Sequence, residues 1–347
     1  ILNVNMKILL IGSDSKYAIE IPYLKHLIES KEVSTVDLFS AQRRFLDYYN
    51  ANIFNKILYR VGVANILSKI NKEILAEVKK TKPDIVFVFK GMEILPETLL
   101  FLKEQGIKLV NYNPDNPFIF SGRGSGNKNI TNSIGLYDLH FTYNLEIKKQ
   151  LEDQYKAKTV LLPFGFDISD NLFETCKKEK EIIKVCFLGN PDKKRATFIE
   201  ELAKNGVAID VFGNDWNKFV NHTNITTHKP VYNEDQWKTL RKYRVQINLM
   251  RIHNEDSHNM RTFEVAGIGG IQVAPYTKEH NLFFEDGNEI FLYKNLQDCV
   301  DKINYLLALS KEEAIELRVA SRNAAVNKKH SYKDRAIQVL EVLKEFK

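Results

Sequence analysis

The sequence predicts an α/β protein made of two doubly wound, Rossmann-like domains that face each other across a cleft. Its 347 residues suggest two domains, at about 100–200 residues per domain. Short apolar runs alternate with amphipathic helical stretches in both halves, which is typical of βα units on a parallel sheet. The pattern also restarts near Lys184: each half begins with a strand that ends in glycine, at Gly12 and at Gly189.

The composition is that of a folded globular protein and excludes several function classes. Hydrophobic residues make up 44% and charged residues 27% of the chain, enough apolar surface for two buried cores. The net charge of +6 is compatible with an anionic ligand or a membrane surface, but is too small to indicate nucleic-acid binding. Cys176, Cys186 and Cys299 form no C-x-x-C pair, which favours buried thiols in a reducing cytoplasm over disulfides or a zinc site.

The first half supplies one doubly wound domain. Apolar runs of strand length, bounded by polar residues or glycine, are Lys7–Ile11, Val33–Phe39, Asp84–Phe89, Lys108–Tyr112, Leu139–Tyr143 and Thr159–Leu162. Apolar residues recur at helical spacing in Tyr17–Ser30, Leu46–Lys80, Pro96–Gln105 and Glu146–Tyr155. These alternating elements predict an N-terminal domain over residues 1–168.

The second half repeats the alternation after Ile168–Glu181, a polar stretch without a strand pattern that we expect to be a linker. Its expected strands are Lys184–Leu188, Ala208–Phe212, Val245–Leu249, Ile271–Ala274 and Glu289–Tyr293, and the helix Ala196–Asn205 follows the first of them. The pattern predicts a C-terminal domain over residues 169–330. In such domains ligands bind at the carboxyl ends of the strands.

The glycine-rich segment Gly122–Lys128 does not match a phosphate-binding fingerprint. Asn127 stands where a P-loop or a G-x-G-x-x-G motif needs glycine. The segment also follows Asn113–Pro117 rather than a strand that leads directly into a helix. Its sequence fits either a flexible basic loop at the edge of a cleft or a plain surface loop.

The most informative stretch is Asp256–Ala274, which contains a short helix. Ser257 is expected to cap this helix and to leave the amides of His258, Asn259 and Met260 exposed in its first turn. Such amides, together with the helix dipole, attract an anion such as a diphosphate.

Two charged residues extend this helix start into a candidate anion site. Arg261 adds a permanent charge on a planar fork suited to phosphate, and Glu264 follows about one helical turn later. The pattern fits an ordinary capped helix with an internal Arg–Glu pair equally well.

The segment Asn259-x-Arg261-x-Phe263-Glu264-x-Ala266-x-x-Gly269-Gly270 resembles the signature of the CgeB-like (spore maturation protein type) glycosyltransferases, a group-1-related GT-B family. The resemblance continues through Phe283–Glu289 and the closing His330–Arg335, and it covers roughly residues 184–340. Leu162–Asp167 is similar to the inter-lobe hinge of the family. The N-terminal half matches only as a generic GT-B lobe.

The resemblance implies a glycosyltransferase whose C-terminal lobe binds a nucleotide-sugar donor and whose N-terminal lobe binds a saccharide, lipid-linked or protein acceptor. In related enzymes the second Glu of an E-x7-E element holds the donor ribose; by position this is Glu264, with Asp256 in place of the first Glu. The remaining residues that the resemblance places at the nucleotide are Gly189, Arg195, Gly213, Asn214, Tyr232, Asn259, Met260 and Arg261. Tyr232 fits either a stacking platform for the base or core packing.

The first half offers two candidate catalytic bases. Asp115 follows the strand Lys108–Tyr112, and Asp14 follows Gly12, which we also count among the candidate nucleotide contacts. Carboxylates at strand carboxyl ends face a cleft, although either Asp could instead cap a turn. A retaining enzyme would need no base.

No metal or cofactor is expected. No D-x-D motif follows a strand and the histidines lack ligand spacing. Helix amides, Arg195 and Arg261 would neutralise the leaving diphosphate instead, so the nucleotide sugar is a co-substrate.

Two other functions remain open for the same fold: a non-catalytic nucleotide-sugar sensor and a nucleotide-sugar epimerase. The stretch Thr35–Lys80 mixes basic, aromatic and apolar residues that could touch an anionic membrane from the cytoplasmic side, although a solvated face over a core stripe fits better.

The C-terminal segment predicts one more helix, over residues 331–347. Its apolar positions recur at three- or four-residue spacing and form a stripe too wide for a free tail; they are Tyr332, Ala336, Val339, Leu340 and Leu343. In GT-B enzymes the last helix crosses back to the N-terminal lobe, and the resemblance places that crossing after Tyr332.

Overall fold

The computed structural model describes residues 6–120, 124–251 and 256–345, and it divides into two compact units. Unit 1 comprises residues 1–163 and 332–347, and unit 2 comprises residues 164–331. The division at Pro163 falls shortly before the expected domain boundary at residue 168.

Unit 1 is built on a six-stranded parallel sheet in the order β2-β1-β3-β4-β5-β6. The strands are β1 (Lys7–Gly12), β2 (Thr35–Ser40), β3 (Ile85–Phe89), β4 (Lys108–Asn113), β5 (Leu139–Thr142) and β6 (Thr159–Leu161). All are registered in parallel, so Gly12 pairs with Ser40 at the same edge at which β3 and β4 end. We call this end of the sheet, where the strands have their carboxyl ends, its carboxyl edge; in this kind of fold, ligands bind there to the loops that follow the strands.

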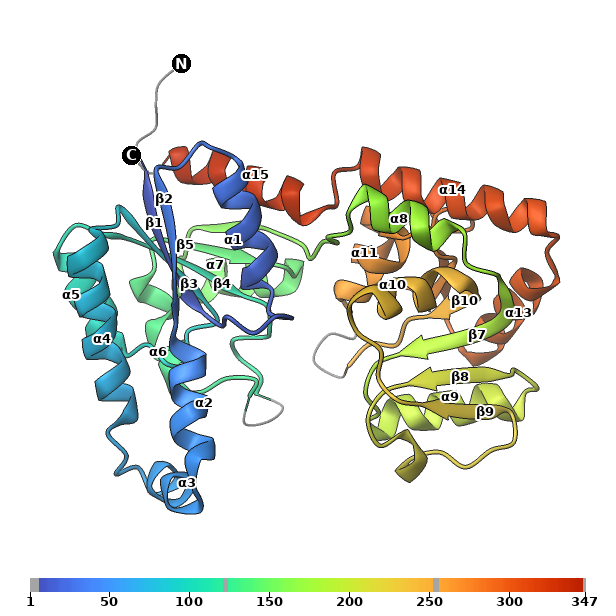
Figure 1. The fold of residues 1–347 in the computed structure, drawn as a ribbon, viewed down its shortest axis with the longest axis horizontal. Helices are drawn as coiled ribbons and strands as arrows, with labels where there is room; N and C mark the ends of the chain where they lie inside the picture. The colour runs from blue at the N-terminus through green and yellow to red at the C-terminus, as the bar shows by residue number, and fades with distance from the viewer. Residues whose placement is uncertain (1–5, 121–123, 252–255, 346–347) are drawn as a thin grey trace. The chain divides into compact units, whose positions relative to one another are not determined.

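Helices cover both faces of this sheet (Figure 1). They are α1 (Glu20–Glu29), α2 (Ala41–Ala51), α3 (Ile53–Arg60), α4 (Ile66–Thr81), α5 (Pro96–Glu104), α6 (Lys128–Ser133), α7 (Leu145–Tyr155) and α15 (Tyr332–Lys344). Alternation along the strands sends Leu9, Val86 and Val88 into one core with residues of α4 and α5 such as Ile70 and Leu99.

The expected single helical stretch over 46–80 is wrong, because the structure breaks it into three helices. Asn52 ends α2 and caps α3, accepting a hydrogen bond from the amide of Asn55 at 2.8 Å. Gly62, with φ of +77°, then turns the chain toward α4. An Asn cap and a left-handed glycine are both ordinary helix boundaries.

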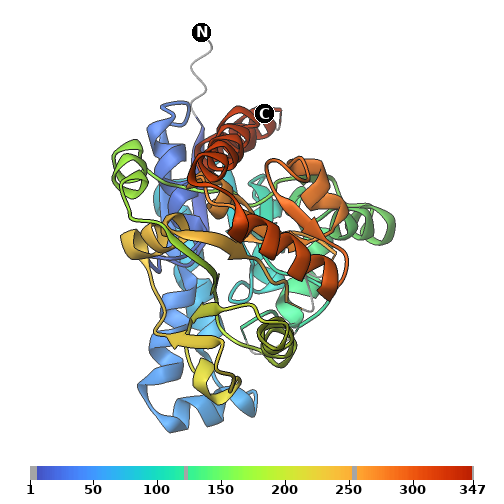
Figure 2. The same cartoon turned by 90° about the vertical axis from the view of Figure 1, so that its right-hand side faces the viewer.

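The last helix of the chain, α15, belongs to unit 1 and lies against α1 (Figures 1 and 2). Tyr332 packs edge-on against Tyr23, with ring centroids 5.5 Å apart. Gln338 Nε2 donates to Leu161 O at 2.9 Å, which ties the helix to β6. All the apolar positions of the expected stripe are buried, namely Tyr332, Ala336, Val339, Leu340 and Leu343.

Unit 2 repeats the plan with a parallel sheet in the order β12-β11-β10-β7-β8-β9. Its strands are β7 (Ile182–Leu188), β8 (Ile209–Phe212), β9 (Ile225–His228), β10 (Tyr243–Ile247), β11 (Gln272–Pro275) and β12 (Phe291–Tyr293). Its helices are α8 (Asp170–Lys177), α9 (Lys193–Lys204), α10 (Asn233–Lys242), α11 (Met260–Gly267), α12 (Lys278–Phe283), α13 (Leu296–Ala308) and α14 (Lys311–Asn327). Strand β9 was not among the expected strands.

The expected linker over 168–181 is also wrong, because most of it is helix α8. Ser169 caps this helix, its hydroxyl accepting from the amide of Leu172 at 3.3 Å. Cys176 is fully buried against a cluster that includes Cys186 and Leu240. A polar sequence with few apolar residues therefore still forms a packed helix, because those few lie on one face.

Each sheet reverses its strand order once, and each reversal places two carboxyl ends side by side. In unit 1 the reversal lies between β1 and β3, and in unit 2 it lies between β7 and β10. The loops that leave such neighbouring strands diverge to opposite faces, so a crevice opens at the switch point. The candidate sites lie at these two edges.

Candidate functional site

Arg195 spans the switch point of unit 2. Its NH1 group donates to Asn190 O, after β7, at 3.2 Å, and its NH2 group donates to Leu249 O, after β10, at 2.8 Å. The guanidinium also lies over the ring of Phe187, 5.5 Å from its centroid. Arg195 is only 8% exposed, so its charge is held at this edge by bonds to both strands.

Helix α11 begins at the same edge, two residues later than expected. Asn259 is the cap and forms a capping box with Thr262, whose amide donates to Asn259 Oδ1 at 3.1 Å. Ser257 is not the cap; its hydroxyl is fully buried and bonds to Glu279. The cap satisfies the amide of Thr262, whereas the first-turn amides of Met260 and Arg261 have no hydrogen-bond partner among the described residues and are available to an anion.

A buried network of polar side chains holds the start of α11 in place. Asn248, just after β10, exchanges hydrogen bonds with Asn259, Nδ2 to Oδ1 at 3.1 Å and the reverse at 2.8 Å. Thr262 Oγ1 lies 3.0 Å from His280 Nε2, and burial lowers the pKa of His280 to about 4, so this imidazole is neutral near pH 7. Linked polar groups of this kind hold a helix terminus in one orientation.

Arg261 and Glu264 lie on the exposed side of α11. Arg261 NH1 is 2.6 Å from Glu264 Oε2, and the two side chains are 21% and 13% exposed. Gln236 Nε2, from α10, donates to Glu264 Oε1 at 3.3 Å. The pair is therefore formed without a ligand, and its ends still reach solvent.

The edge of unit 2 concentrates positive charge. Burial, and then the charges of Arg251 and Arg261, lower the pKa of Arg195 to about 10. Arg195 Nε is buried and has no hydrogen-bond partner within the residues that the structure describes. Arg251, exposed just after β10, was not anticipated from the sequence, although its place at a strand end could have indicated it. Three arginines that repel one another are a favourable setting for a bound anion.

The glycines of this edge let backbone segments approach closely. A Cβ on Gly213 would lie 2.3 Å from the carbonyl oxygen of Gly189, so no side chain fits there. The amide of Asn214 donates to Asn190 Oδ1 at 3.0 Å, and Trp216 Nε1 donates to Gly189 O at 2.8 Å. The loops after β7 and β8 thus form one hydrogen-bonded wall beside Arg195.

Two other residues that were expected to contact the nucleotide, Tyr232 and Asp256, are exposed. Tyr232, at the start of α10, is 46% exposed and is therefore not a core residue. Asp256 is exposed and follows residues 252–255, which lie outside the described residues.

The switch point of unit 1 carries buried carboxylates. Glu20, 7% exposed at the start of α1, accepts a hydrogen bond from the amide of Ser13 at 2.7 Å. A Cβ on Gly12 would lie 2.4 Å from Glu20 Oε1, so Gly12 makes room for this carboxylate. Burial raises the pKa of Glu20 and raises that of Glu93 to about 7. Sequence patterns did not indicate either residue.

Asp14 and Asp115, the expected bases, are both engaged in ion pairs. Arg43 bonds to Asp14, with Nε 3.0 Å from Oδ1. Although burial raises the pKa of Asp14, hydrogen bonds with Ser40 and Arg43 outweigh it and lower the pKa overall. Lys90 Nζ is 2.5 Å from Asp115 Oδ2, and the same ammonium acts electrostatically on Glu20 and Glu93.

The expected flexible loop is described only from Gly124, since Gly122 and Arg123 lie outside the described residues. Asn127 caps α6 and its Nδ2 donates to Met92 O at 2.9 Å, while Lys90 Nζ bonds to Gly124 O. This part of the loop is therefore fastened to the end of β3.

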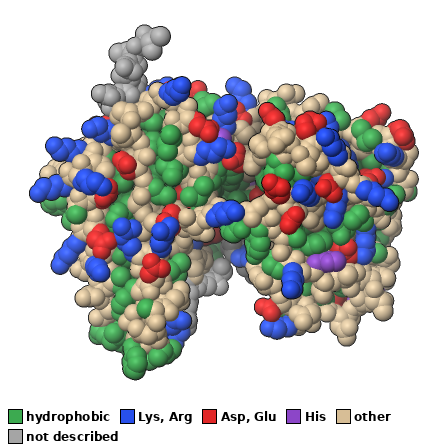
Figure 3. All heavy atoms as spheres, viewed as in Figure 1, with side chains coloured by type: hydrophobic (Ala, Val, Ile, Leu, Met, Phe, Trp, Pro, Cys, Tyr) green, Lys and Arg blue, Asp and Glu red, His purple; other side chains and the backbone are tan. Residues whose placement is uncertain are grey.

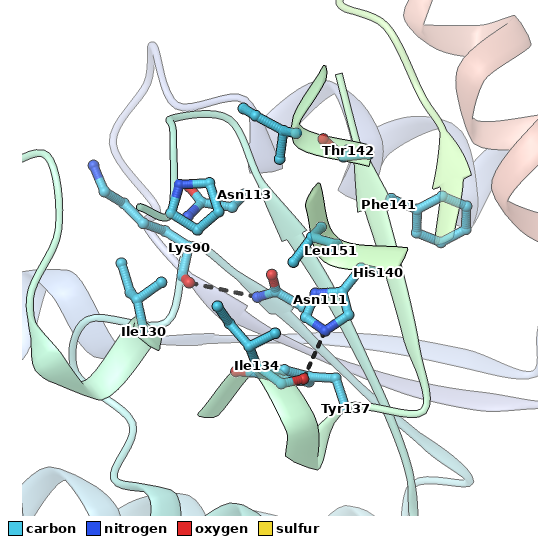
Figure 4. A pocket seen from close by; sticks show the side chains of 12 residues that line it. Lys90, Asn111, Asn113, Ile130, Ile134, Tyr137, His140, Phe141, Thr142 and Leu151 are labelled. Atoms are coloured by element: carbon cyan, nitrogen blue, oxygen red, sulfur yellow. Dashed lines mark hydrogen bonds between the residues drawn. The ribbon is translucent and has the colours of Figure 1, made fainter. Parts of the chain in front are cut away.

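A small cavity lies behind this loop in unit 1 (Figure 4). Two of its polar side chains have partners: His140 Nε2 lies 2.8 Å from Ile134 O and Asn111 Nδ2 donates to Val88 O at 3.1 Å. Asn113 Nδ2, in contrast, is buried and has no hydrogen-bond partner among the described residues. Burial lowers the pKa of His140 to about 4, so the ring is neutral. The remaining walls combine aliphatic side chains such as Ile130 and Leu151 with aromatic and polar ones such as Tyr137 and Thr142.

Two absences apply to residues 6–120, 124–251 and 256–345. In these ranges no group of three or more His, Cys, Asp or Glu side chains is arranged to hold a metal ion. No helix in the same ranges is long and apolar enough to cross a bilayer.

Comparison with known proteins identifies the fold. Residues 194–341 match the family model described as Glycosyl transferase-like, while no curated protein matches the sequence. Three solved structures are similar over nearly their whole length.

Sucrose-phosphate synthase from Thermosynechococcus elongatus has a TM-score of 0.71 at 12% identity, covering 99% of each chain. Anabaena HepE in complex with UDP-glucose has a TM-score of 0.63 at 13% identity, covering 98% of this chain and 100% of that one. UDP-GlcNAc 2-epimerase from Neisseria meningitidis, bound to UDP-GlcNAc, has a TM-score of 0.57 at 14% identity, covering 98% and 100%.

These likenesses establish an α/β protein of the GT-B fold, as the sequence predicted. The match to the family model lies within unit 2 and α15, the part that carries Arg195, Arg251 and the α11 helix start.

Proposed function

We propose that this chain is a glycosyltransferase that moves a sugar from a nucleoside diphosphate donor, bound by unit 2, to an acceptor. The observation that carries the proposal is the convergence of Arg195, Arg251 and Arg261 with the free first-turn amides of α11 at one switch point. Fixed cations and helix amides together are suited to a diphosphate. The glycosyl transferase-like model that matches residues 194–341 supports the same conclusion.

In the proposed mechanism unit 2 stabilises the leaving group. Breaking the bond between the sugar and the nucleoside diphosphate leaves negative charge on the diphosphate, and the arginines and amides offset it. The wall formed by Gly189 and Gly213 lets the backbone approach the nucleotide closely. Glu264 accepts hydrogen bonds from the ribose hydroxyls, which requires Arg261 to turn from its carboxylate toward the phosphates.

Unit 1 would supply the acceptor side. If the reaction inverts the sugar, a base must take the acceptor proton, and a carboxylate with a raised pKa is better matched to that task near neutral pH. Glu20 and Glu93 meet this condition, whereas Asp14 and Asp115 are held by Arg43 and Lys90. We therefore place Glu20 and Glu93 ahead of the two aspartates as candidates. The acceptor we propose is a saccharide, lipid-linked or protein hydroxyl.

The finer assignment to the CgeB-like type rests on the segment Asn259–Gly270 and the closing His330–Arg335. A cytoplasmic, metal-independent enzyme is part of the same proposal.

The donor site can be tested by calorimetry with UDP and with pyrophosphate. Glu264→Ala should weaken UDP binding by about 10–150-fold, because charge-assisted hydrogen bonds contribute roughly 1.5–3 kcal/mol. Pyrophosphate binding should not weaken, because the substitution also frees Arg261 from its ion pair. Arg251→Ala should weaken both ligands. Glu316→Ala, which removes an exposed carboxylate on α14, is the matched control. Equal UDP affinity in Glu264→Ala and in the control would mean that Glu264 is only a helix residue.

Turnover separates the proposed transferase from the two other functions of this fold. With UDP-glucose or UDP-GlcNAc and no acceptor, an epimerase forms the epimer of its substrate, whereas a transferase gives at most slow hydrolysis. With an extract of candidate acceptors, a transferase releases UDP and labels the acceptor. Binding without either product would indicate a sensor.

A further inference from the structure

An exposed apolar surface lies on α3, the short helix between α2 and α4 in unit 1. We name it the α3 tip; it consists of Ile53, Phe54, Ile57, Leu58, Val61 and Val63, which are 41–72% exposed. No residue of α3 is buried. Figure 3 shows hydrophobic side chains gathered where Figure 1 places α3. The expected solvated face over a core stripe, stated for Thr35–Lys80, is not seen in α3, because its outward residues are largely apolar.

The tip is ordered and held in place by its inner side. Tyr59 packs edge-on against Phe45, with centroids 4.8 Å apart, and against Tyr49 at 5.8 Å. Asn55 Nδ2 donates to Tyr48 O at 2.7 Å, which ties α3 to α2. After the helix, the amide of Val63 donates to Leu58 O at 3.1 Å, so the chain turns back within a hydrogen-bonded loop. The apolar side chains are thus presented on a fixed scaffold.

The apolar residues form one continuous arc of the helix. At about 100° per residue, Ile53, Ile57, Val61, Phe54 and Leu58 fall within roughly 140° of one another. Lys56 and Arg60 lie next to this arc on the side of Ile53. Neither forms an ion pair within the described residues, although Lys56 Nζ lies 5.5 Å from the ring centroid of Tyr49.

The positive charge beside the α3 tip indicates an anionic partner. Residues 52–63 contain Lys56 and Arg60 and no acidic residue. Apolar side chains bordered by lysine and arginine match the boundary of an anionic bilayer, where the apolar groups enter the acyl region and the cations stay at the phosphates. A second copy would fit less well, because a symmetric contact would bring two basic tips together.

We propose that the α3 tip is a peripheral membrane anchor that inserts into the surface of an anionic lipid bilayer. It would hold unit 1 at the membrane without any spanning helix. The anchor stands independently of the proposed transfer reaction. It also has a direct connection to the edge of the sheet: α2 starts directly after Ser40, the residue that pairs with Gly12, and Arg43 in its first turn bonds to Asp14.

Vesicle flotation with the full chain tests this proposal. Wild type should float with vesicles of phosphatidylcholine and phosphatidylglycerol at 3:1 and bind pure phosphatidylcholine at least tenfold more weakly, with binding reduced by salt. Phe54→Ser/Val61→Ser should lose binding at least tenfold. The matched control Ile183→Ser/Leu282→Ser removes two equally exposed apolar side chains of unit 2 and should bind as wild type does.

A second measurement follows the tip directly. Because the three native cysteines are buried, Phe54→Cys can be labelled selectively with an environment-sensitive dye. Its emission should rise and shift to the blue with anionic vesicles, while the same dye at Ile183→Cys should not respond. Melting temperatures within about 2 °C of wild type would show that the variants fold.

Three outcomes would overturn the proposal. One is no flotation of folded wild type on anionic vesicles, and another is equal flotation of Phe54→Ser/Val61→Ser. The third is a wild-type dimer in light scattering that becomes monomeric in that variant, with no vesicle binding by either, which would make the tip a contact between copies. Loss of flotation alongside normal sugar transfer in solution would support the anchor.

Discussion

At the scale of single residues, the two sheet edges use charge in opposite ways. The edge of unit 2 holds Arg195 by bonds to two loops and places Arg251 and Arg261 near it, which suits an anion. The edge of unit 1 surrounds Lys90 with carboxylates, among them Glu93. A cluster of acids around one lysine leaves at least one carboxyl able to hold a proton near neutral pH.

Glu93 provides a test of that arrangement. The pKa of its carboxyl is about 7 in the folded protein and 4.5 without perturbation, so between these values the folded state binds more protons than the unfolded state. Stability should therefore fall as pH rises from 4.5 to 7. Glu93→Gln cannot ionise, so its free energy of unfolding should decrease less than that of wild type over this pH range. The difference should be about 1–3 kcal/mol, since one pKa unit corresponds to about 1.4 kcal/mol. Urea unfolding at pH 5, 6, 7 and 8 measures it.

The control for this experiment is Glu316→Gln, an exposed glutamate of α14. It should follow the wild-type pH dependence. Identical curves for all three proteins would show that Glu93 titrates normally.

Local pattern predicted some site residues and could not predict others. Arg261 and Glu264 were visible because they sit one turn apart next to a helix cap. The raised pKa of Glu20 arises from burial against the loop after β1. The charge of Glu20 also raises the pKa of Glu93, because the fold brings these two residues near each other. Such effects come from tertiary contacts, so spacing in the sequence carries no sign of them.

At the scale of elements, the end of α11 depends on one glycine. A Cβ on Gly267 would lie 2.4 Å from Cγ of Phe166, which packs against that turn. Although alanine favours a helix by up to about 1 kcal/mol, Gly267→Ala should destabilise the protein by roughly 1–3 kcal/mol because the ring has to move. Chemical denaturation measures the change.

Gly135→Ala is the matched control, because a Cβ at this position would have no neighbour within 4 Å and its φ is not in the left-handed region. Phe166→Leu should recover part of the loss in the Gly267→Ala background. A Gly267→Ala protein as stable as the control would show that Phe166 moves freely.

Helix α15 should stabilise unit 1, although it lies far along the chain. A protein ending at Ser331 loses five buried apolar side chains, of which Val339, Leu340 and Leu343 contribute about 1.5–3 kcal/mol each. Hydrogen exchange should then increase in α1 and the sheet of unit 1. Leu343→Ala, expected to cost about 2–5 kcal/mol, tests the same contact if the shortened chain does not fold. New exchange confined to residues 164–331 would contradict this assignment.

Elements were predictable where the apolar period was strong and unbroken. The strand at Ile85–Phe89 and the stripe of α15 both lie where the sequence placed them. The break of the 46–80 stretch was missed because Asn52 and Gly62 act through a cap and a left-handed turn, and each is a single residue inside a helical pattern. Helix α8 was missed because few of its residues are buried.

At the scale of the whole molecule, the proposed chemistry needs no added ion. Arginines and helix amides are available to neutralise a diphosphate, so sugar transfer should continue at full rate in excess EDTA. Release of the nucleoside diphosphate, followed with and without chelator, measures this. Activity that disappears with EDTA and returns with Mg²⁺ or Mn²⁺ would contradict it, while activity that responds to neither would support it.

The route of the chain has a consequence for its synthesis on the ribosome. Unit 1 is interrupted in sequence: residues 164–331 form unit 2, and α15 follows them. The growing chain therefore exposes the site of α15 on unit 1 while all of unit 2 is being translated, whereas unit 2 has all of its residues before unit 1 does. Because nascent domains fold as units once complete, unit 2 should reach its native state first, and unit 1 should wait for the last helix to emerge.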